Sequence, residues 1–159
     1  DDNIGVVSLS NGKTLMPHVI NWNVIERLLG LEQQNWSEKF KKQNKETEEA
    51  VIKQNKDFMT SKKSDTKPTH KLNDYAGSYF NKAYGNLIID YHDNQLKFTY
   101  NDMVYPLEHF NYDTFILRDD GNITPVSFYL NESGDIVKLK IPFDPDAGKI
   151  KFKKNTDKK

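Results

Sequence analysis

The feature that most constrains the fold is a series of short alternating segments that fills residues 72–154. Apolar and polar residues alternate within each segment, and turn signals such as Asp93-Asn94 and Asp119-Asp120-Gly121 separate the segments. Alternation of this kind is typical of β-strands that bury one face only. About eight such strands, spaced at roughly 8–12 residues, predict an antiparallel meander that can close into a small up-and-down barrel without exposed edges. The fold class is therefore expected to be mainly β, and α+β overall, because helices precede the barrel.

The first 35 residues have a different pattern. Residues 4–10 form a short β-branched run that ends at the turn pair Asn11-Gly12, which predicts one strand. No partner strand follows it, so its backbone groups are expected to need a sheet elsewhere. Apolar residues then recur at helical spacing over residues 16–30, where Pro17 suits the first turn and Gly30 suits a C-cap.

A second helix is predicted from Trp36 to about Lys62, capped by the side chain of Asn35. Its middle has almost nothing to bury, so we expect it to be largely exposed. A polar linker runs from there to Lys71. The predicted organisation is thus a strand and helix in 1–35, a charged helix and linker in 36–71, the barrel in 72–154 and a tail in 155–159.

The net charge of zero hides an uneven distribution. By count of Lys and Arg against Asp and Glu, residues 37–71 carry ten against six, residues 72–147 five against twelve, and residues 148–159 six against one. Phosphate binding needs clustered cations on the folded surface, so an acidic domain argues against nucleic acid as the ligand. The lysines of the helix and the tail are most simply explained as solvated charges.

Composition and motifs exclude several chemistries. The chain has no cysteine, which rules out disulfides and thiol nucleophiles, and no apolar run of about 18 residues that would span a membrane. Residues 64–67 (SDTK) match the SxxK pattern of serine β-lactamases, but that pattern needs a buried helix and here lies in a polar linker. The four histidines lack the spacing of metal ligands. We therefore expect no catalytic, metal-binding or cofactor-binding residue.

The block from Leu107 to Phe115 is rich in polar and aromatic groups and contains the pair Glu108-His109. Neighbouring residues of a strand point to opposite faces, so this pair is not expected to act as an acid–base couple. The block instead predicts a strand–turn–strand corner in which His109 bonds the turn.

One set of residues resembles a known family. The pattern runs through Leu72-x-x-Tyr75-Ala76-Gly77-Ser78-Tyr79, Tyr84-Gly85, the 107–115 block with His109, Tyr112, Asp113 and Phe115, and the closing Ile150-x-Phe152-Lys153. It is similar to the domain of unknown function at the C-terminus of bacterial serine β-lactamase-like hydrolases of the class C and penicillin-binding type. Phe110 stands where that family often has Trp. Tyr75, Gly77, Tyr79, Tyr84 and Gly85, with the four residues of the block, are taken as a structural signature.

The resemblance implies a lipocalin-like barrel attached to a catalytic domain, whose last strand and helix would correspond to residues 1–35. The first residues resemble neither a signal peptide nor an initiator, so the chain is expected to derive from a longer one. The expected function is a non-catalytic accessory domain, periplasmic or secreted, that acts in assembly or in access to the parent active site. Its own hydrolase domain is the expected partner, and self-association is a second option.

The alternative function is a small-ligand binding module of lipocalin type, with a lipid or a peptidoglycan fragment inside the barrel. Aromatic residues on the strands motivate it, although filling a small core is their commoner use.

Overall fold

The computed structural model describes residues 3–12, 14–144 and 147–155. The chain divides into two compact units, Asp1–Gln54 and Asn55–Lys159. Each unit is described by itself.

The first unit contains helix α1 (Met16–Leu28) and the start of helix α2 (Trp36–Thr60). The indole rings of Trp22 and Trp36 stack with centroids 4.9 Å apart and join the two helices. The predicted helix over 16–30 ends two residues early, where Gly30 takes a φ of 65° and the Leu31 amide bonds the Glu26 carbonyl. This is the C-cap geometry for which glycine is suited.

The predicted strand over residues 4–10 is not formed. These residues are described without helix or strand, and Val7 and Leu9 are 85% and 92% exposed. The Ser8 hydroxyl donates to the Pro17 carbonyl (3.0 Å) and to the Asn21 side chain, so the segment contacts α1. A strand needs a neighbour to satisfy its backbone groups, and the described part of this unit offers none.

Helix α2 begins as predicted, since the Asn35 side chain accepts the Glu38 amide at 3.1 Å. It ends at Thr60, and none of its residues is buried. None of the described helices is long and apolar enough to span a membrane.

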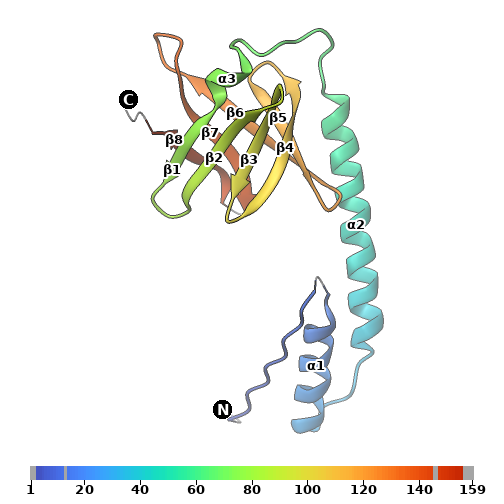
Figure 1. Cartoon of the computed structure of the whole chain (residues 1–159). Coiled ribbons are helices and arrows are strands. Elements are labelled where there is room, and N and C mark those ends of the chain that lie inside the picture. Colours follow the sequence, from blue (N-terminus) through green and yellow to red (C-terminus); the bar gives the residue numbers. More distant parts are fainter. Residues whose placement is uncertain (1–2, 13, 145–146, 156–159) are drawn as a thin grey trace. The chain divides into compact units, whose positions relative to one another are not determined.

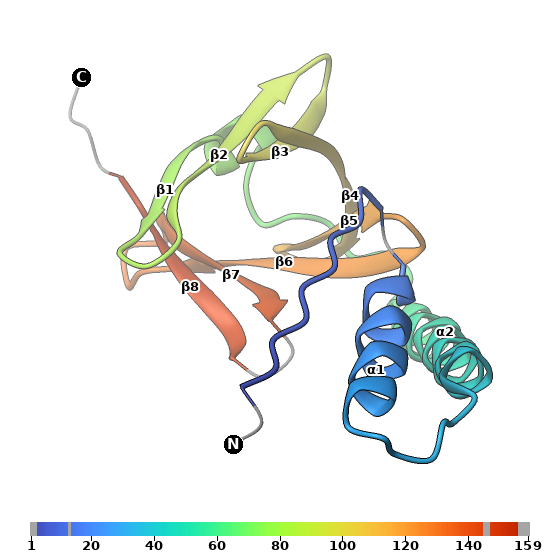
Figure 2. The ribbon, with the colours of Figure 1, turned by 90° about the horizontal axis from the view of Figure 1, so that it is seen from below.

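The second unit confirms the predicted barrel. Eight antiparallel strands pair in sequence order and close into a barrel through β1 and β8, as Figures 1 and 2 show. Short helix α3 (Leu72–Tyr75) precedes the first strand. The strands are β1 (Gly77–Asn81), β2 (Gly85–His92), β3 (Gln95–Tyr100), β4 (Met103–Asn111), β5 (Thr114–Asp119), β6 (Asn122–Leu130), β7 (Ile136–Asp144) and β8 (Gly148–Lys154).

Large side chains fill the inside of the barrel. Inward positions of all eight strands carry buried residues, and the largest are aromatic: Tyr79, Phe98, Phe115, Phe128 and Phe152. Their rings meet edge to face, for example Phe115 with Phe128 at 5.7 Å and 90°. The aromatic residues of the strands are therefore used for packing.

The end of α2 covers part of the outer face of the barrel. A β-bulge between His109 and Asn111 leaves Phe110 as an extra residue, and its ring stacks on Phe58 of α2 at 4.4 Å. The Asn55 side-chain amide donates to the Gly121 carbonyl at 2.6 Å. In β5, Phe115 and Leu117 face inward, so Ile116 between them faces outward. Ile116 is nevertheless only 2% exposed. The last turns of α2 thus belong structurally to the barrel.

This cover can be tested by replacing Phe58 with alanine. Loss of the stacked ring is expected to lower the free energy of unfolding of the barrel by about 1–3 kcal/mol. The measurement is urea unfolding followed by far-UV circular dichroism at the strand signal. Ile52→Ala is the control, since Ile52 is 67% exposed, and it should cost under about 0.5 kcal/mol. Equal effects of the two variants would show that the helix end does not stabilise the barrel.

Candidate functional site

The structure gathers most of the signature residues at one end of the barrel. Because the strands alternate in direction, α3, the β4–β5 turn and the β6–β7 turn share this end, called the α3 end below. Seven of the nine residues lie there: Tyr75, Gly77, Tyr79, His109, Tyr112, Asp113 and Phe115. Tyr84 and Gly85 lie at the opposite end, in the β1–β2 hairpin.

Asp113 is the polar centre of the α3 end. Its carboxylate accepts the Thr69 amide (2.9 Å), the Thr69 hydroxyl (2.9 Å) and the Tyr75 hydroxyl. We call Thr69, Tyr75 and Asp113 the Asp113 clasp. The clasp ties the linker before α3 to the turn between β4 and β5, two segments more than 35 residues apart in sequence.

The pKa values of Asp113 and Tyr75 favour the hydrogen bonds of the clasp at neutral pH. Partial burial by itself raises the pKa of Asp113, but the hydrogen bonds from Tyr75 and Thr69 outweigh burial, so the pKa lies below its ordinary value of 3.8. Burial and the bond to Asp113 raise the pKa of Tyr75 to about 12. At neutral pH the pair is therefore a carboxylate and a neutral phenol, which is a stable donor–acceptor arrangement.

The clasp is continuous with the core. The Tyr75 ring is fully buried and meets Phe115 and Phe128 at 5.2 and 4.9 Å. The Tyr79 hydroxyl donates to the Tyr75 carbonyl at 2.7 Å. The pKa of Tyr79 is raised, mainly because the side chain is buried and also because Tyr75 lies close by. Both tyrosine hydroxyls form hydrogen bonds within the protein, as those of buried tyrosines usually do.

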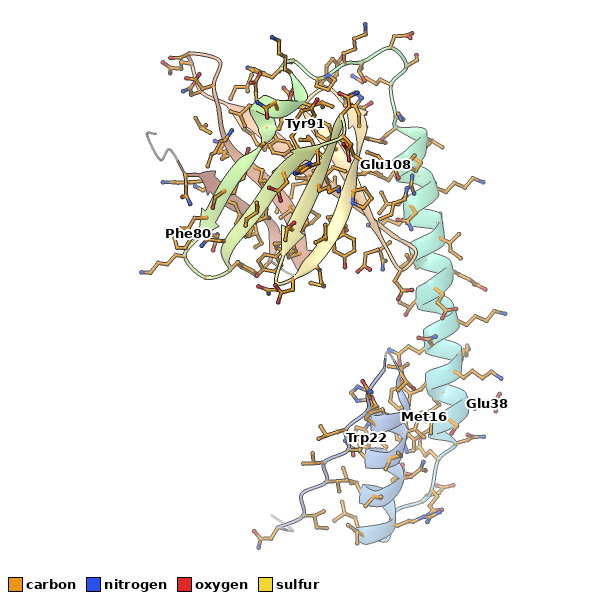
Figure 3. All side chains as sticks on the ribbon, viewed as in Figure 1. Met16, Trp22, Glu38, Phe80, Tyr91 and Glu108 are labelled. Carbon is orange, nitrogen blue, oxygen red and sulfur yellow. The ribbon has the colours of Figure 1, made fainter. Side chains whose placement is uncertain are left out.

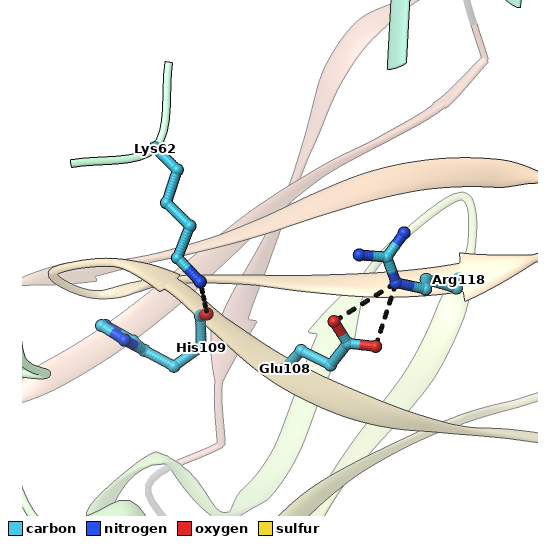
Figure 4. Close-up of polar contacts among 4 residues, drawn as sticks. All are labelled: Lys62, Glu108, His109 and Arg118. Carbon is cyan, nitrogen blue, oxygen red and sulfur yellow. Dashed lines mark hydrogen bonds and ion pairs between the residues drawn. The ribbon is translucent and has the colours of Figure 1, made fainter. Parts of the chain in front are cut away.

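His109 bonds the turn, as the sequence predicts. A ring nitrogen (Nε2) lies 2.9 Å from the Tyr112 carbonyl, and Tyr112 takes a φ of 46°, a strained value for a tyrosine. Glu108 points the other way and pairs with Arg118 at 3.0 Å (Figure 4). The two neighbouring side chains are not coupled, so the block is a corner of the barrel.

The other two signature residues shape the opposite end. The Tyr84 carbonyl accepts the Tyr100 hydroxyl at 2.9 Å, and its ring stacks on Phe143. Gly85 has a φ of 77°, which favours glycine in this hairpin. These two residues contribute to packing far from the Asp113 clasp.

A groove of about 470 Å³ lies at the α3 end, lined by His70, Asn73, Asp74, Ala76, Asp135, Ile136 and Lys154. The Lys154 ammonium donates to the Asp74 carbonyl at 2.6 Å and lies over the Tyr79 ring. Burial lowers the pKa of Lys154, and Asp74 opposes this effect. These contacts occupy the ammonium group. His70 also lines the groove, and its Nδ1 lies 2.8 Å from the Thr69 hydroxyl, which is bound to the Asp113 carboxylate.

The remaining sequence motifs do not assemble into a site. Residues 64–67 lie in a linker without helix, and both Ser64 and Lys67 are exposed, so the SxxK match lacks the geometry that its chemistry requires. Within the described ranges, no group of three or more His, Asp or Glu side chains is arranged to hold a metal ion.

Sequence reasoning missed three residues that the structure shows to be important here. Thr69 sits in a polar linker, and Lys154 sits in a basic tail, so neither has a periodic signal. Phe58 had a helical position but no visible partner. Their contacts arise only when distant segments meet.

Comparison with known proteins agrees with this geometry. The crystal structure of the C-terminal domain of penicillin binding protein Rv0907 matches with a TM-score of 0.50 and 25% identity, over 59% of this chain and 94% of that one. This chain is thus similar in fold to the C-terminal domain of a penicillin binding protein. Residues 61–154 match the family described as Domain of unknown function (DUF3471), and the chain belongs to this family. No curated protein matches.

The Asp113 clasp makes a testable contribution to stability. Asp113→Asn replaces a charged acceptor by a neutral one and should lower the free energy of unfolding by about 1–2 kcal/mol at pH 7, a value reduced for solvent screening. Asp102→Asn, in the β3–β4 turn at the opposite end, is the matched control and should be near neutral, since Asn tolerates its φ of 64°.

The same pair of variants gives a pH test. Because the folded pKa of Asp113 is lowered, its contribution is present above the ordinary value of 3.8 and is lost as pH falls through the folded pKa. The stability difference between wild type and Asp113→Asn should therefore be constant from pH 7 to about 5 and shrink below about 4. A difference that stays constant to pH 2 would contradict the clasp, as would additivity of Asp113→Asn with Tyr75→Phe.

Proposed function

We propose that this chain carries the non-catalytic C-terminal accessory domain of a serine hydrolase of the β-lactamase and penicillin-binding type. The observation that carries the proposal is the similarity to the C-terminal domain of a penicillin binding protein over 94% of that domain. In this proposal the domain acts in assembly with its hydrolase domain or shapes access to the parent active site. Its location is extracellular or periplasmic, where penicillin-binding enzymes act.

The organisation of the chain fits this role. Residues 1–35 would be the last strand and helix of the hydrolase domain, residues 36–71 the connection, residues 72–154 the barrel and residues 155–159 a tail, of which 156–159 lie outside the described residues. The extended, unpaired segment over 4–10 and the exposed Val7 and Leu9 support a missing sheet. The filled barrel and the Asp113 clasp support a structural use of the signature residues.

The accessory role predicts that the chain does not hydrolyse β-lactams. Nitrocefin and a D-amino-acid ester should be cleaved no faster by the chain than by its Ser64→Ala variant, because Ser64 is exposed in a linker without a base. The measurement is absorbance of the cleaved substrate. Turnover that disappears in Ser64→Ala would overturn the proposal.

The partner is tested by the coding sequence upstream of Asp1 and by the complete protein. We expect SxxK on a helix, a YxN and a Lys-Thr-Gly-like strand upstream. Deletion of residues 55–159 from the complete protein should then change its oligomeric state or its kcat/KM for an ester substrate. An upstream region without these motifs, or a deletion with no effect on either quantity, would count against the role.

The alternative, a ligand inside the barrel, is disfavoured because aromatic side chains occupy the interior. A thermal-shift screen with lipids and peptidoglycan fragments tests it. A ligand-induced rise in melting temperature that differs between the wild type and Phe98→Ala would favour the alternative.

A further inference from the structure

The outer face of β7 and β8 concentrates positive charge. Lysines alternate with inward apolar residues on both strands, and the outward set is Lys138, Lys140, Lys149, Lys151 and Lys153. We call these five residues the lysine face. The strands that carry it are adjacent, and both are labelled in Figures 1 and 2.

The strand register places these cations directly opposite one another. Lys138 pairs with Lys153 and Lys140 pairs with Lys151. Like charges directly opposite across two strands destabilise a sheet. No described side chain forms an ion pair with any of the five lysines.

The described side chains in register with four of these lysines include no acidic group. The two rows that the register defines are Ser127–Lys140–Lys151 and Tyr129–Lys138–Lys153–Phe80. Lys138 and Lys140 both lie over the Tyr129 ring, at 5.5 and 5.1 Å from its centroid. Phe80 is 45% exposed at the edge of this face and points away from the barrel (Figure 3).

From this arrangement we propose that the lysine face docks on an anionic phospholipid surface. Each lysine ammonium is a point charge on a flexible stem, and the face contains no arginine fork and lines neither of the described grooves. Such groups suit a plane of many phosphates better than one phosphate in a defined pose. The exposed ring of Phe80 fits the interfacial region of a bilayer.

The same details disfavour single-stranded nucleic acid. Proteins that bind it stack bases on exposed aromatic rings. The Tyr129 ring is covered by two ammonium groups, which leaves Phe80 as the exposed ring of the two rows. The sequence adds two further lysines after residue 155, so the basic character continues beyond β8.

The experiment is sedimentation of the whole chain with vesicles. Phosphatidylcholine vesicles should not bind it, whereas vesicles with about three parts in ten of phosphatidylglycerol should, and raising salt from about 50 to 300 mM should abolish binding. The variant Lys138→Gln/Lys140→Gln/Lys151→Gln/Lys153→Gln should lose affinity by a factor on the order of several hundred, since each of the four lysines contributes about fivefold at the surface.

A control variant removes the same charge elsewhere. Lys53→Gln/Lys56→Gln/Lys67→Gln/Lys71→Gln changes exposed lysines of α2 and the linker. It should weaken binding less than threefold, because it removes the same net charge but leaves the lysine face intact. Equal losses in the two variants, or absence of binding by the wild type to the anionic vesicles in low salt, would overturn the proposal. Tighter binding to a ~20-nucleotide oligo-dT than to the vesicles would also overturn it.

Folding is measured on the same variants. Since the lysine pairs repel, their replacement should leave the melting temperature unchanged or raise it. A lower melting temperature together with lost vesicle binding would mean that the lysines are structural, and would overturn the docking role. The outcome does not depend on the accessory function, because it needs no hydrolase domain.

Discussion

The barrel depends on the closure between its first and last strands. Neighbouring pairs elsewhere in the sheet have four or more register partners in most cases, whereas β1 and β8 join through Tyr79 with Lys154 and Phe80 with Lys153. Two further bonds extend this seam. The Asn155 backbone amide donates to the Ser78 carbonyl at 2.8 Å, and the Asn81 side-chain amide donates to the Lys151 carbonyl at 2.8 Å. Without the seam the sheet would have two free edges and an open aromatic core.

The Asp113 clasp and the end of α2 support this closed sheet from outside. The clasp holds the chain just before β1, and the stacking of Phe58 on Phe110 covers the bulge in β4. Both act on the corner formed by β4 and β5. This explains why the polar block around His109 looks like a site in sequence: its groups are committed to holding a turn with a strained Tyr112.

The sequence predicted the barrel, its eight strands and the turn contact of His109, because alternation and turn residues are local signals. It could not predict the Thr69–Asp113 bonds or the Phe58 stacking, since these join segments more than 40 residues apart. The predicted strand over 4–10 is not formed, for a different reason. Propensity indicates an extended segment, but only a neighbouring strand makes that segment part of a sheet. Alternation also predicts which face of a strand is polar, but only the register places Lys138 opposite Lys153 and Lys140 opposite Lys151.

The lysine face also limits how copies of this chain can meet. Two barrels that packed these faces together would bring ten ammonium groups into one layer with no described carboxylate between the strands. Desolvating so many like charges is unfavourable, so a homo-oligomer would have to use another surface. Electrostatics thus disfavours this side of the barrel as a surface for self-association, and the cause is the register of a single strand pair.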